Sequence, residues 1–426
     1  MSRLTVHPSG THVMRDGRFF PMIFDTAWAA FPDAGIEEWR YYVTSRRMQG
    51  FTGMLVQALP CLHDRSIRKE SRVPFALDAN GHYKFDQPDL DYFATARELV
   101  RIARDEGMVI CLAFLWVNYV PNTWGAKLTP WAVMPDAHRR DYVSLITKTF
   151  AEFDPIFVVS GDEHFTDPVA IATYVEVLDQ VAREAPHCLT AVHSAPTADL
   201  PAVLADSPNL DIYGYQSGHD LATQHRCYDL AALYMGKSVR RPILNMEPVY
   251  EEFGIPPDTP ARWLASDVRR AIWWSILAGA AAGIGYGAHG VWSWHARGNE
   301  FLTQSSVREP FPWQAAMHFP GANDVSLAGL LLCEYGLYDY VPDQEVIINN
   351  PGEVRAASSA DGKRVAIYTP YATAVSVRRS GQHTQVAAWS LSDRRPITTR
   401  LRNDESVHID MVDVPGDAII ILERAE

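Results

Sequence analysis

The sequence predicts a (β/α)₈ TIM barrel, an α/β fold, followed by a small C-terminal antiparallel β-sandwich domain. Between residue 20 and about residue 335, short apolar runs alternate with longer amphipathic segments, which is the pattern of repeated βα units. There are eight such runs, and eight parallel strands with connecting helices favour a closed barrel over an open sheet. After Pro342 the pattern changes to short strands of alternating polarity separated by turns.

The eight predicted strands are short segments rich in aliphatic and aromatic residues. They are 20–25, 52–57, 108–116, 156–162, 188–193, 210–217, 242–247 and 283–289. The segments between them carry signals of helix ends: one helix ends at Gly50, and another begins at Asp89 and ends at Gly107. A third is predicted to begin with Thr259 as its N-cap and Pro260 at its first helical position.

The two ends of the chain differ from the barrel pattern. Residues 1–19 contain a turn at Asp16 and Gly17 and are predicted to form a hairpin that closes the bottom of the barrel. The barrel itself is assigned to residues 20–342. Residues 343–426 are assigned to the β-sandwich-like domain.

Composition and charge exclude several classes of partner. The chain has 426 residues, 47% of them hydrophobic, and a net charge of -13, which gives a nucleic-acid partner no electrostatic support. The most apolar long segment, residues 271–290, becomes rich in glycine towards its end. It is therefore predicted to be a buried helix and strand rather than a membrane span, and no membrane partner is expected.

The N-terminus and the cysteines favour a cytoplasmic protein. No basic region followed by an apolar stretch and a small-residue cleavage site is visible at the N-terminus. The five cysteines are scattered, odd in number and without CxxC spacing, so reduced thiols are expected. The sequence makes no prediction of oligomeric state.

Polar, acidic and aromatic residues gather at the carboxyl ends of the predicted strands, where barrel enzymes build their active sites. The residues expected to bind substrate there are Asp25, Trp28, Gln57, Trp116, Glu163, His193, Gln216, His219, Tyr250, His289, Trp292 and Trp294. Two acidic positions complete the set, Asp162 after the fourth strand and Glu247 after the seventh.

This combination fits glycoside hydrolysis. One carboxylic acid must protonate the leaving oxygen while a second, ionised carboxylate acts at the anomeric carbon. The fourth and seventh strands lie across the barrel mouth from each other, so carboxylates there can face a sugar bound between them. Trp and Tyr rings can stack on sugar rings, and the polar side chains can satisfy hydroxyl groups.

Several motifs strengthen this interpretation. "FDTAW", "VVSGDEHF", "YQSGH", "LNMEPVYE" and "YGAHGVWSW", followed by a β-rich tail, resemble the apiosidase-like glycoside hydrolases, a retaining family with a (β/α)₈ barrel and a C-terminal β-sandwich. The resemblance implies that Asp162 is the acid/base and Glu247 the nucleophile, with Glu163 as a rival acid/base. It also implies a substrate-binding role for Asp25. Ser160 stands where the family pattern has a second glycine.

Each of these residues also has a structural alternative. Glu247 could be an acid paired with Arg240 or Arg241, and Asp162 could cap the helix that follows it. Asp25 could form an Asx turn.

For the histidines and tryptophans the alternative is packing. Metal ligation by the histidines is disfavoured because a metallohydrolase barrel is expected to offer an HxH pair after the first strand, where this chain has "FDTAW". The sequence therefore predicts neither a metal nor a cofactor.

The sequence as a whole predicts a retaining glycoside hydrolase. Its expected reaction is release of a terminal sugar, which the resemblance indicates to be apiose or a related pentofuranoside, from a plant-derived oligosaccharide or glycoside. The alternatives are a β-glucosidase or endoglucanase-like activity on the same barrel and a carbohydrate-binding protein without catalysis. A metal-dependent amidohydrolase is a further alternative, which a chelator would inactivate.

Overall fold

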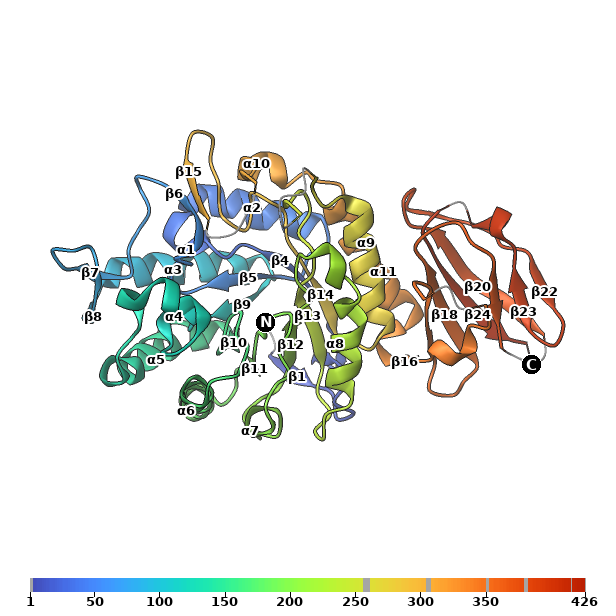
Figure 1. Ribbon diagram of the computed structural model, residues 1–426, viewed down its shortest axis with the longest axis horizontal. Helices are drawn as coiled ribbons and strands as arrows, with labels where there is room; N and C mark the ends of the chain where they lie inside the picture. Colours follow the sequence, from blue (N-terminus) through green and yellow to red (C-terminus); the bar gives the residue numbers. More distant parts are fainter. Residues whose placement is uncertain are drawn as a thin grey trace.

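The barrel prediction is confirmed by the structure, a computed structural model that describes residues 3–255, 261–303, 308–349, 352–378, 382–414 and 416–425. Figure 1 shows the strands of the barrel surrounded by helices, with the second, all-β part on one side. The barrel strands are β4 (Met22–Thr26), β5 (Gly53–Gln57), β9 (Val109–Ala113), β10 (Ile156–Val158), β11 (Thr190–Ala191), β12 (Tyr213–Gln216), β13 (Ile243–Glu247) and β14 (Gly283–Tyr286).

The eight strands form one closed parallel sheet. Their order is β11-β10-β9-β5-β4-β14-β13-β12. Two parallel bridges, from Ala191 to Ile212 and from Ser194 to Tyr215, join its two ends. Closure brings the carboxyl ends of all eight strands around a single opening.

Helices connect the barrel strands and cover most of the outside of the barrel. They are α1 (Ala30–Asp33), α2 (Ile36–Met48), α3 (Leu90–Asp105), α4 (Trp124–Leu128), α5 (Asp136–Phe150), α6 (Pro168–Glu184), α7 (Ala202–Ala205), α8 (Arg226–Met235), α9 (Ala265–Leu277), α10 (Trp313–Ala316) and α11 (Gly321–Tyr335). Asp89 caps α3 as predicted, since its side chain accepts hydrogen bonds from the amides of Asp91 and Tyr92. The predicted cap of α9 at Thr259 and Pro260 lies outside the described residues, and the helix begins at Ala265.

Short 3₁₀ helices lie in the connections. They are η1 (Val117–Tyr119), η2 (Pro130–Ala132), η3 (Ala151–Phe153), η4 (Leu221–Thr223), η5 (Leu337–Asp339), η6 (Gln344–Val346) and η7 (Met411–Asp413). None of the helices in the described part of the chain is both long and apolar enough to cross a membrane.

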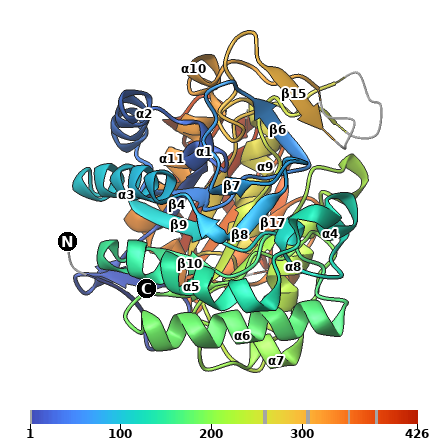
Figure 2. The ribbon, with the colours of Figure 1, turned by 90° about the vertical axis from the view of Figure 1, so that its left-hand side faces the viewer.

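Additional strands surround the opening of the barrel. The connection from β5 to α3 contains β6 (Asp64–Ile67) and the antiparallel pair β7 (Phe75–Leu77) and β8 (Tyr83–Pro88). Strand β6 pairs with β15 (Glu300–Thr303), which follows β14 in the chain. Figure 2 shows these strands on the side of the barrel that faces the viewer. They deepen the opening on the side of the second strand.

The N-terminal strands lie at the opposite end of the barrel. Strands β1 (Leu4–Val6), β2 (Val13–Arg15) and β3 (Arg18–Phe19) form an antiparallel sheet. The amide of Leu4 donates to Asp154, and the guanidinium of Arg15 donates to the carbonyl of Gly107. Gly107 and Asp154 lie two residues before the first residues of β9 and β10. The contacts support the proposed role of this segment at the bottom of the barrel.

The C-terminal part consists of two antiparallel sheets. The first contains β16 (Val341–Pro342), β17 (Arg355–Ser358), β18 (Arg364–Thr369), β24 (Ala418–Arg424), β20 (His383–Ser390) and β21 (Arg395–Pro396). The second contains β19 (Val375–Val377), β23 (Val407–Ile409) and β22 (Leu401–Asn403). A separate apolar core that includes Val365, Val377, Val407 and Ile420 lies between them.

Ion pairs join this part to the barrel. Arg269 of α9 contacts Asp417 at 2.5 Å and Asp324 of α11 at 3.0 Å, and Asp324 also contacts Arg394 at 2.7 Å. The indole nitrogen of Trp274 donates to the carbonyl of Glu353. Since Asp324 is buried between two arginines, these contacts fix the β-sandwich on α9 and α11.

Candidate active site

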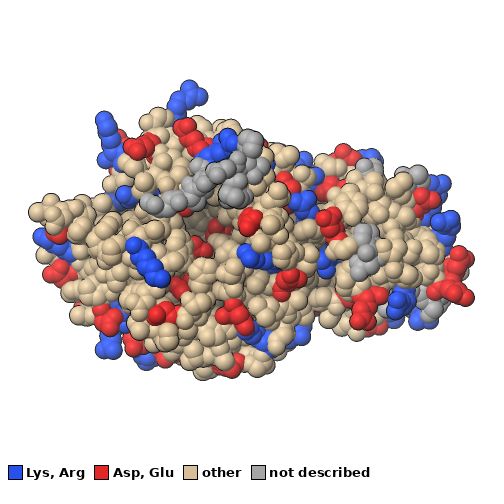
Figure 3. All heavy atoms as spheres, viewed as in Figure 1, with Lys and Arg blue, Asp and Glu red and all other residues tan. Residues whose placement is uncertain are grey.

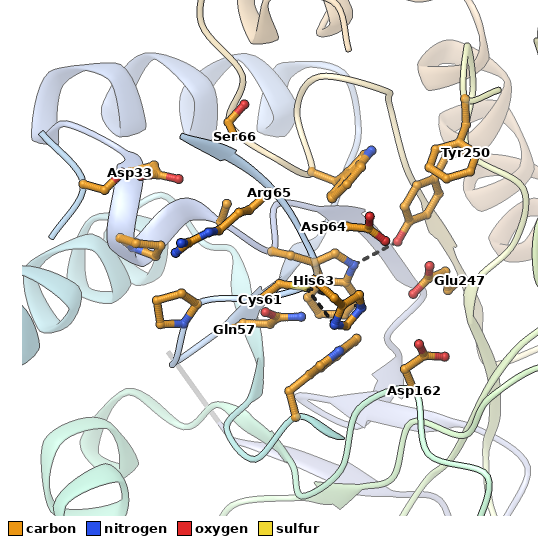
Figure 4. A pocket seen from close by; sticks show the side chains of 18 of the residues that line it. Asp33, Gln57, Cys61, His63, Asp64, Arg65, Ser66, Asp162, Glu247 and Tyr250 are labelled. Carbon is orange, nitrogen blue, oxygen red and sulfur yellow. Dashed lines mark hydrogen bonds between the residues drawn. The ribbon is translucent and has the colours of Figure 1, made fainter. Parts of the chain in front are cut away.

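A cavity of about 360 Å³ opens at the carboxyl ends of the barrel strands, within the size range of small-ligand sites. Figure 3 shows the surface hollowed over the barrel. Figure 4 shows Asp162 and Glu247 at one end of the cavity and Asp33 at the other. Of the residues predicted from sequence, those that line it are Trp28, Gln57, Trp116, Asp162, Gln216, His219, Glu247, Tyr250 and Trp292.

Glu247 is the last residue of β13 and its carboxylate lies between two histidines. Nε2 of His219 lies 3.1 Å from Oε1 and makes a hydrogen bond to it. Nε2 of His193 lies 3.2 Å from Oε2, although its N–H direction falls outside hydrogen-bond geometry. Only 7% of Glu247 is exposed, so these contacts account for most of its polar surroundings.

Backbone amides fix the tautomers of both histidines. Nδ1 of His193 accepts the amide N–H of Asp162 at 3.1 Å, and Nδ1 of His219 accepts the amide N–H of Tyr250 at 3.4 Å. A neutral imidazole that accepts at Nδ1 carries its proton on Nε2. Both histidines therefore carry their proton on Nε2, the nitrogen nearer to Glu247, and His219 donates it to the carboxylate.

These contacts keep Glu247 ionised. Burial alone would raise the pKa of the Glu247 carboxyl, but the N–H groups of His193 and His219 outweigh burial and hold the pKa well below its usual range. Glu247 is therefore a carboxylate throughout the neutral and mildly acidic range.

Asp162 follows β10 with a left-handed backbone, at a φ of 57°. Its amide N–H donates to His193, and its carbonyl accepts the indole N–H of Trp124 at 2.8 Å. Burial, and next the negative charge of Glu247, raise the pKa of the Asp162 carboxyl to about 7. Near pH 6 the carboxyl group of Asp162 is thus mostly protonated while that of Glu247 is ionised.

Contacts of Ser160 and Gly161 explain why these residues precede Asp162 in the "VVSGD" sequence. A Cβ atom on Gly161 would lie 1.7 Å from the ring of Trp116, so only glycine fits there. The hydroxyl of Ser160 accepts the amide N–H of His193 at 3.0 Å and donates to the carbonyl of His193 at 3.2 Å.

Unpaired polar atoms also belong to the residues that line the cavity. Oε1 of Gln57 and Nε1 of Trp116 are buried without a hydrogen-bond partner among the described residues. Tyr250 is better satisfied, since its hydroxyl accepts the indole N–H of Trp28 at 2.9 Å. These two unpaired atoms carry a desolvation cost.

Comparisons with known proteins agree with the fold. Residues 10–338 match the family model described as "Apiosidase-like, catalytic domain". The chain belongs to this family. The match covers the barrel and both carboxyl groups, so this apiosidase-like chain is a glycoside hydrolase.

Solved structures show the same fold over most of their length. A protein named "Glycoside hydrolase" is 18% identical with a TM-score of 0.82, and the match covers 100% of this chain and 97% of that chain. A glycoside hydrolase family 5 protein from Bacteroides vulgatus is also 18% identical, with a TM-score of 0.81 and coverage of 99% and 94%. A family 5 mannosidase from Rhizomucor miehei is 11% identical, with a TM-score of 0.53 and coverage of 78% and 99%. No curated protein sequence matches the chain.

Two of the residues expected to bind substrate in this apiosidase-like protein have structural partners instead. Asp25 is fully buried in an ion pair with Arg46 at 2.6 Å and accepts a hydrogen bond from Tyr42. Glu163 accepts the amide N–H of Phe165 at 2.8 Å and does not line the cavity. The substrate-binding prediction for both is corrected, and Glu163 is not placed to act as the acid/base.

Three aromatic residues need the same correction. Trp294 is fully buried, stacks on Trp313 and does not line the cavity. His289 donates to the carbonyl of Arg308 and accepts from the indole of Trp292, so both of its nitrogens are used inside the protein. His193 lies behind the cavity wall and contacts Glu247 rather than the cavity.

The sequence reasoning missed one wall of the cavity. That wall comes mainly from the connection between β5 and α3 and contains Pro60, Cys61, His63, Asp64, Arg65, Ser66, Ser71, Arg72, Val73 and Tyr83. The signal was the length of this connection, since more than about 15 residues between a strand and its helix is typical of a functional loop. The described residues contain no group of three His, Cys, Asp or Glu side chains arranged to hold a metal ion.

Proposed function

We propose that this protein is a retaining glycoside hydrolase in which Glu247 is the nucleophile and Asp162 the acid/base. The observation that carries the proposal is that two carboxyl groups with different surroundings line one cavity, Asp162 after β10 and Glu247 between two histidines. The pKa of Asp162 is raised to about 7, whereas that of Glu247 is held low by its histidines. A retaining glycosidase needs this division between a protonated acid and an ionised nucleophile.

In the first step an oxygen of Glu247 attacks the anomeric carbon of the sugar. The bond to the leaving oxygen breaks, and Asp162 gives its proton to that oxygen. The product is an ester between the sugar and Glu247, together with the released alcohol.

In the second step Asp162 acts as a base. Formation of the ester removes the negative charge of Glu247, which is the second-largest cause of the raised pKa of Asp162. The pKa of Asp162 falls, and its carboxylate takes a proton from water as the water oxygen attacks the anomeric carbon. Glu247 leaves as the carboxylate, and Asp162 is again protonated.

The proposed substrate is a terminal apiose or a related pentofuranoside on a plant-derived oligosaccharide or glycoside. Family membership supports the sugar, and the cavity supports binding of a single ring next to the carboxyl groups. Trp28, Trp116 and Trp292 supply faces for stacking, while Gln57 and Gln216 supply groups for its hydroxyls.

A β-glucosidase or endoglucanase-like reaction is the second candidate. It would use the same chemistry at Asp162 and Glu247, on a barrel similar to that of a family 5 glycoside hydrolase with a TM-score of 0.81.

A panel of phenyl glycosides tests both candidates. Apiosides, arabinofuranosides and glucosides are offered to the wild type and to Glu247→Ala, Asp162→Ala and Glu163→Gln. We expect turnover of one pentofuranoside by the wild type and by Glu163→Gln, which alters a neighbouring carboxylate outside the cavity. Full turnover by Glu247→Ala would contradict the assignment.

A further inference from the structure

We infer that Ser160 and His193 form a positioning clamp that fixes the two catalytic carboxyl groups relative to each other. The inference rests on the proposed roles of Asp162 and Glu247. It assigns functions to two residues that contact no substrate, one of which differs from the glycine of the family pattern.

His193 contacts both carboxylate residues through its two ring nitrogens. Nδ1 accepts the amide N–H of Asp162 at 3.1 Å, while Nε2 lies 3.2 Å from the carboxylate of Glu247. The ring is fully buried and packs against Trp116 and Trp28, with centroid distances of 5.4 and 5.8 Å. A shift of this ring therefore changes the position of the acid/base and the environment of the nucleophile together.

Ser160 holds the backbone of His193. Strand β11 has only two residues, and the ladder between β10 and β11 reaches as far as the bond from the amide of Val159 to the carbonyl of Ala191. Beyond that bond, the next residue after Val159 is Ser160, whose hydroxyl accepts from the amide of His193 and donates to its carbonyl. Without this hydroxyl both backbone groups would be left unpaired in a buried site, which is unfavourable.

The backbone of Asp162 depends on this arrangement. Its left-handed conformation, with a φ of 57°, is uncommon for a residue with a side chain and requires support from its surroundings. That support comes from His193 on the amide and from Trp124 on the carbonyl. Ser160 thus acts on Asp162 through His193.

Two variants separate the contacts of His193. His193→Asn keeps an acceptor near the position of Nδ1 but has nothing near Nε2, so the pKa of Glu247 rises and the acidic limb of kcat/KM moves to higher pH. His193→Gln keeps a donor towards Glu247 but loses the acceptor for Asp162. Its kcat/KM falls about 10- to 100-fold for a phenyl glycoside, which needs the acid, and much less for a dinitrophenyl glycoside.

Ser160→Ala and Ser160→Gly remove the hydroxyl that holds the backbone of His193 and so test the clamp directly. We expect these variants to show the effects of both His193 variants, but smaller. Their kcat/KM for the phenyl glycoside should fall about 3- to 10-fold, and the acidic limb of kcat/KM should move to higher pH. Ser194→Ala is the matched control. Ser194 is a fully buried serine beside His193 whose hydroxyl bonds Tyr234 at 2.8 Å and contacts neither carboxyl group.

The tautomer of His193 gives a readout that does not need activity. Nitrogen-15 NMR should show protonation at Nε2 in the wild type and in Ser194→Ala, and an altered or averaged signal in Ser160→Ala. The clamp would be overturned if both Ser160 variants kept the wild-type tautomer of His193, the wild-type acidic limb of kcat/KM and the wild-type dependence on the leaving group. It would also be overturned if Ser194→Ala changed these properties as much as the Ser160 variants do. A wild type that cleaves no glycoside would instead overturn the proposed function, and the NMR comparison would still decide the clamp.

Discussion

Asp25 and Glu247 are both buried carboxylates at the carboxyl ends of barrel strands, yet their surroundings differ in kind. Asp25 meets a permanent cation, Arg46, and the hydroxyl of Tyr42, both from α2, and it has no access to the cavity. Glu247 meets two histidine N–H groups on one side and the cavity on the other. The partners of a strand-end acid, rather than its position, therefore distinguish a structural residue from a reactive one.

The spacing on α2 explains the structural site. Tyr42 and Arg46 are four residues apart, so they lie on the same face of the helix and reach Asp25 together. The resulting ion pair fixes α2 on the barrel. The carboxylate of Glu247 has no such cation, which leaves it available to attack a carbon atom.

The largest expected effect is on the reactive side of the comparison. Glu247→Gln should lower kcat/KM by about 10⁴-fold or more, because the amide is not a nucleophile. The midpoint of thermal unfolding should change little, since the amide oxygen can still accept from His219. Steady-state kinetics and calorimetry measure the two quantities, and retained turnover would refute the assignment of Glu247.

Removal of the acid should have a smaller effect that depends on the leaving group. Asp162→Asn is expected to lower kcat/KM by about 10²- to 10⁴-fold with a phenyl glycoside. With a dinitrophenyl glycoside the loss should be much smaller, because that leaving group departs without a proton. An equal loss with both substrates would remove Asp162 from the acid role.

Loss of the cation beside Asp25 should have the opposite effect, a large change in stability and little change in kcat/KM. Arg46→Met leaves Asp25 as a buried charge without its cation and should lower the free energy of unfolding by about 3–5 kcal/mol. In the folded fraction kcat/KM should stay within a few-fold of the wild-type value. Urea unfolding and kinetics at low temperature check this, with Arg139→Met, a substitution in the ion pairs of α5 far from the cavity, as control. If Arg46→Met lowered kcat/KM but left the stability unchanged, Asp25 would have to be assigned to substrate binding after all.

The sequence predicted the barrel well because burial is visible as apolar runs. The limits of the strands were less accurate: the run 108–116 continues past the end of β9 at Ala113, and the run 188–193 contains the two residues of β11. A run of apolar residues indicates that a segment is buried. Because the strand and the turn after it are both buried here, the run does not show where the strand ends.

The site was predicted in part for a related reason. Asp162, Glu247 and most of the aromatic wall were found because they stand at strand ends. Asp25 and His289 stand there too, but their side chains leave the opening for partners on α2 and in the loop at Arg308, and no local pattern records this. The wall formed by His63 and its neighbours was missed because an irregular connection has no periodicity.

The most direct test of the proposed mechanism is the pKa of Asp162, measured by carbon-13 NMR of the labelled carboxyl group. We expect a value of about 7 in the wild type, so that Asp162 is protonated below that pH and kcat/KM falls as the pH rises through it. In Glu247→Gln the pKa should fall, because the negative charge that raises it is gone, although burial remains. A wild-type pKa near the ordinary value for aspartate, or one that Glu247→Gln leaves unchanged, would contradict the proposed pair of acid and nucleophile.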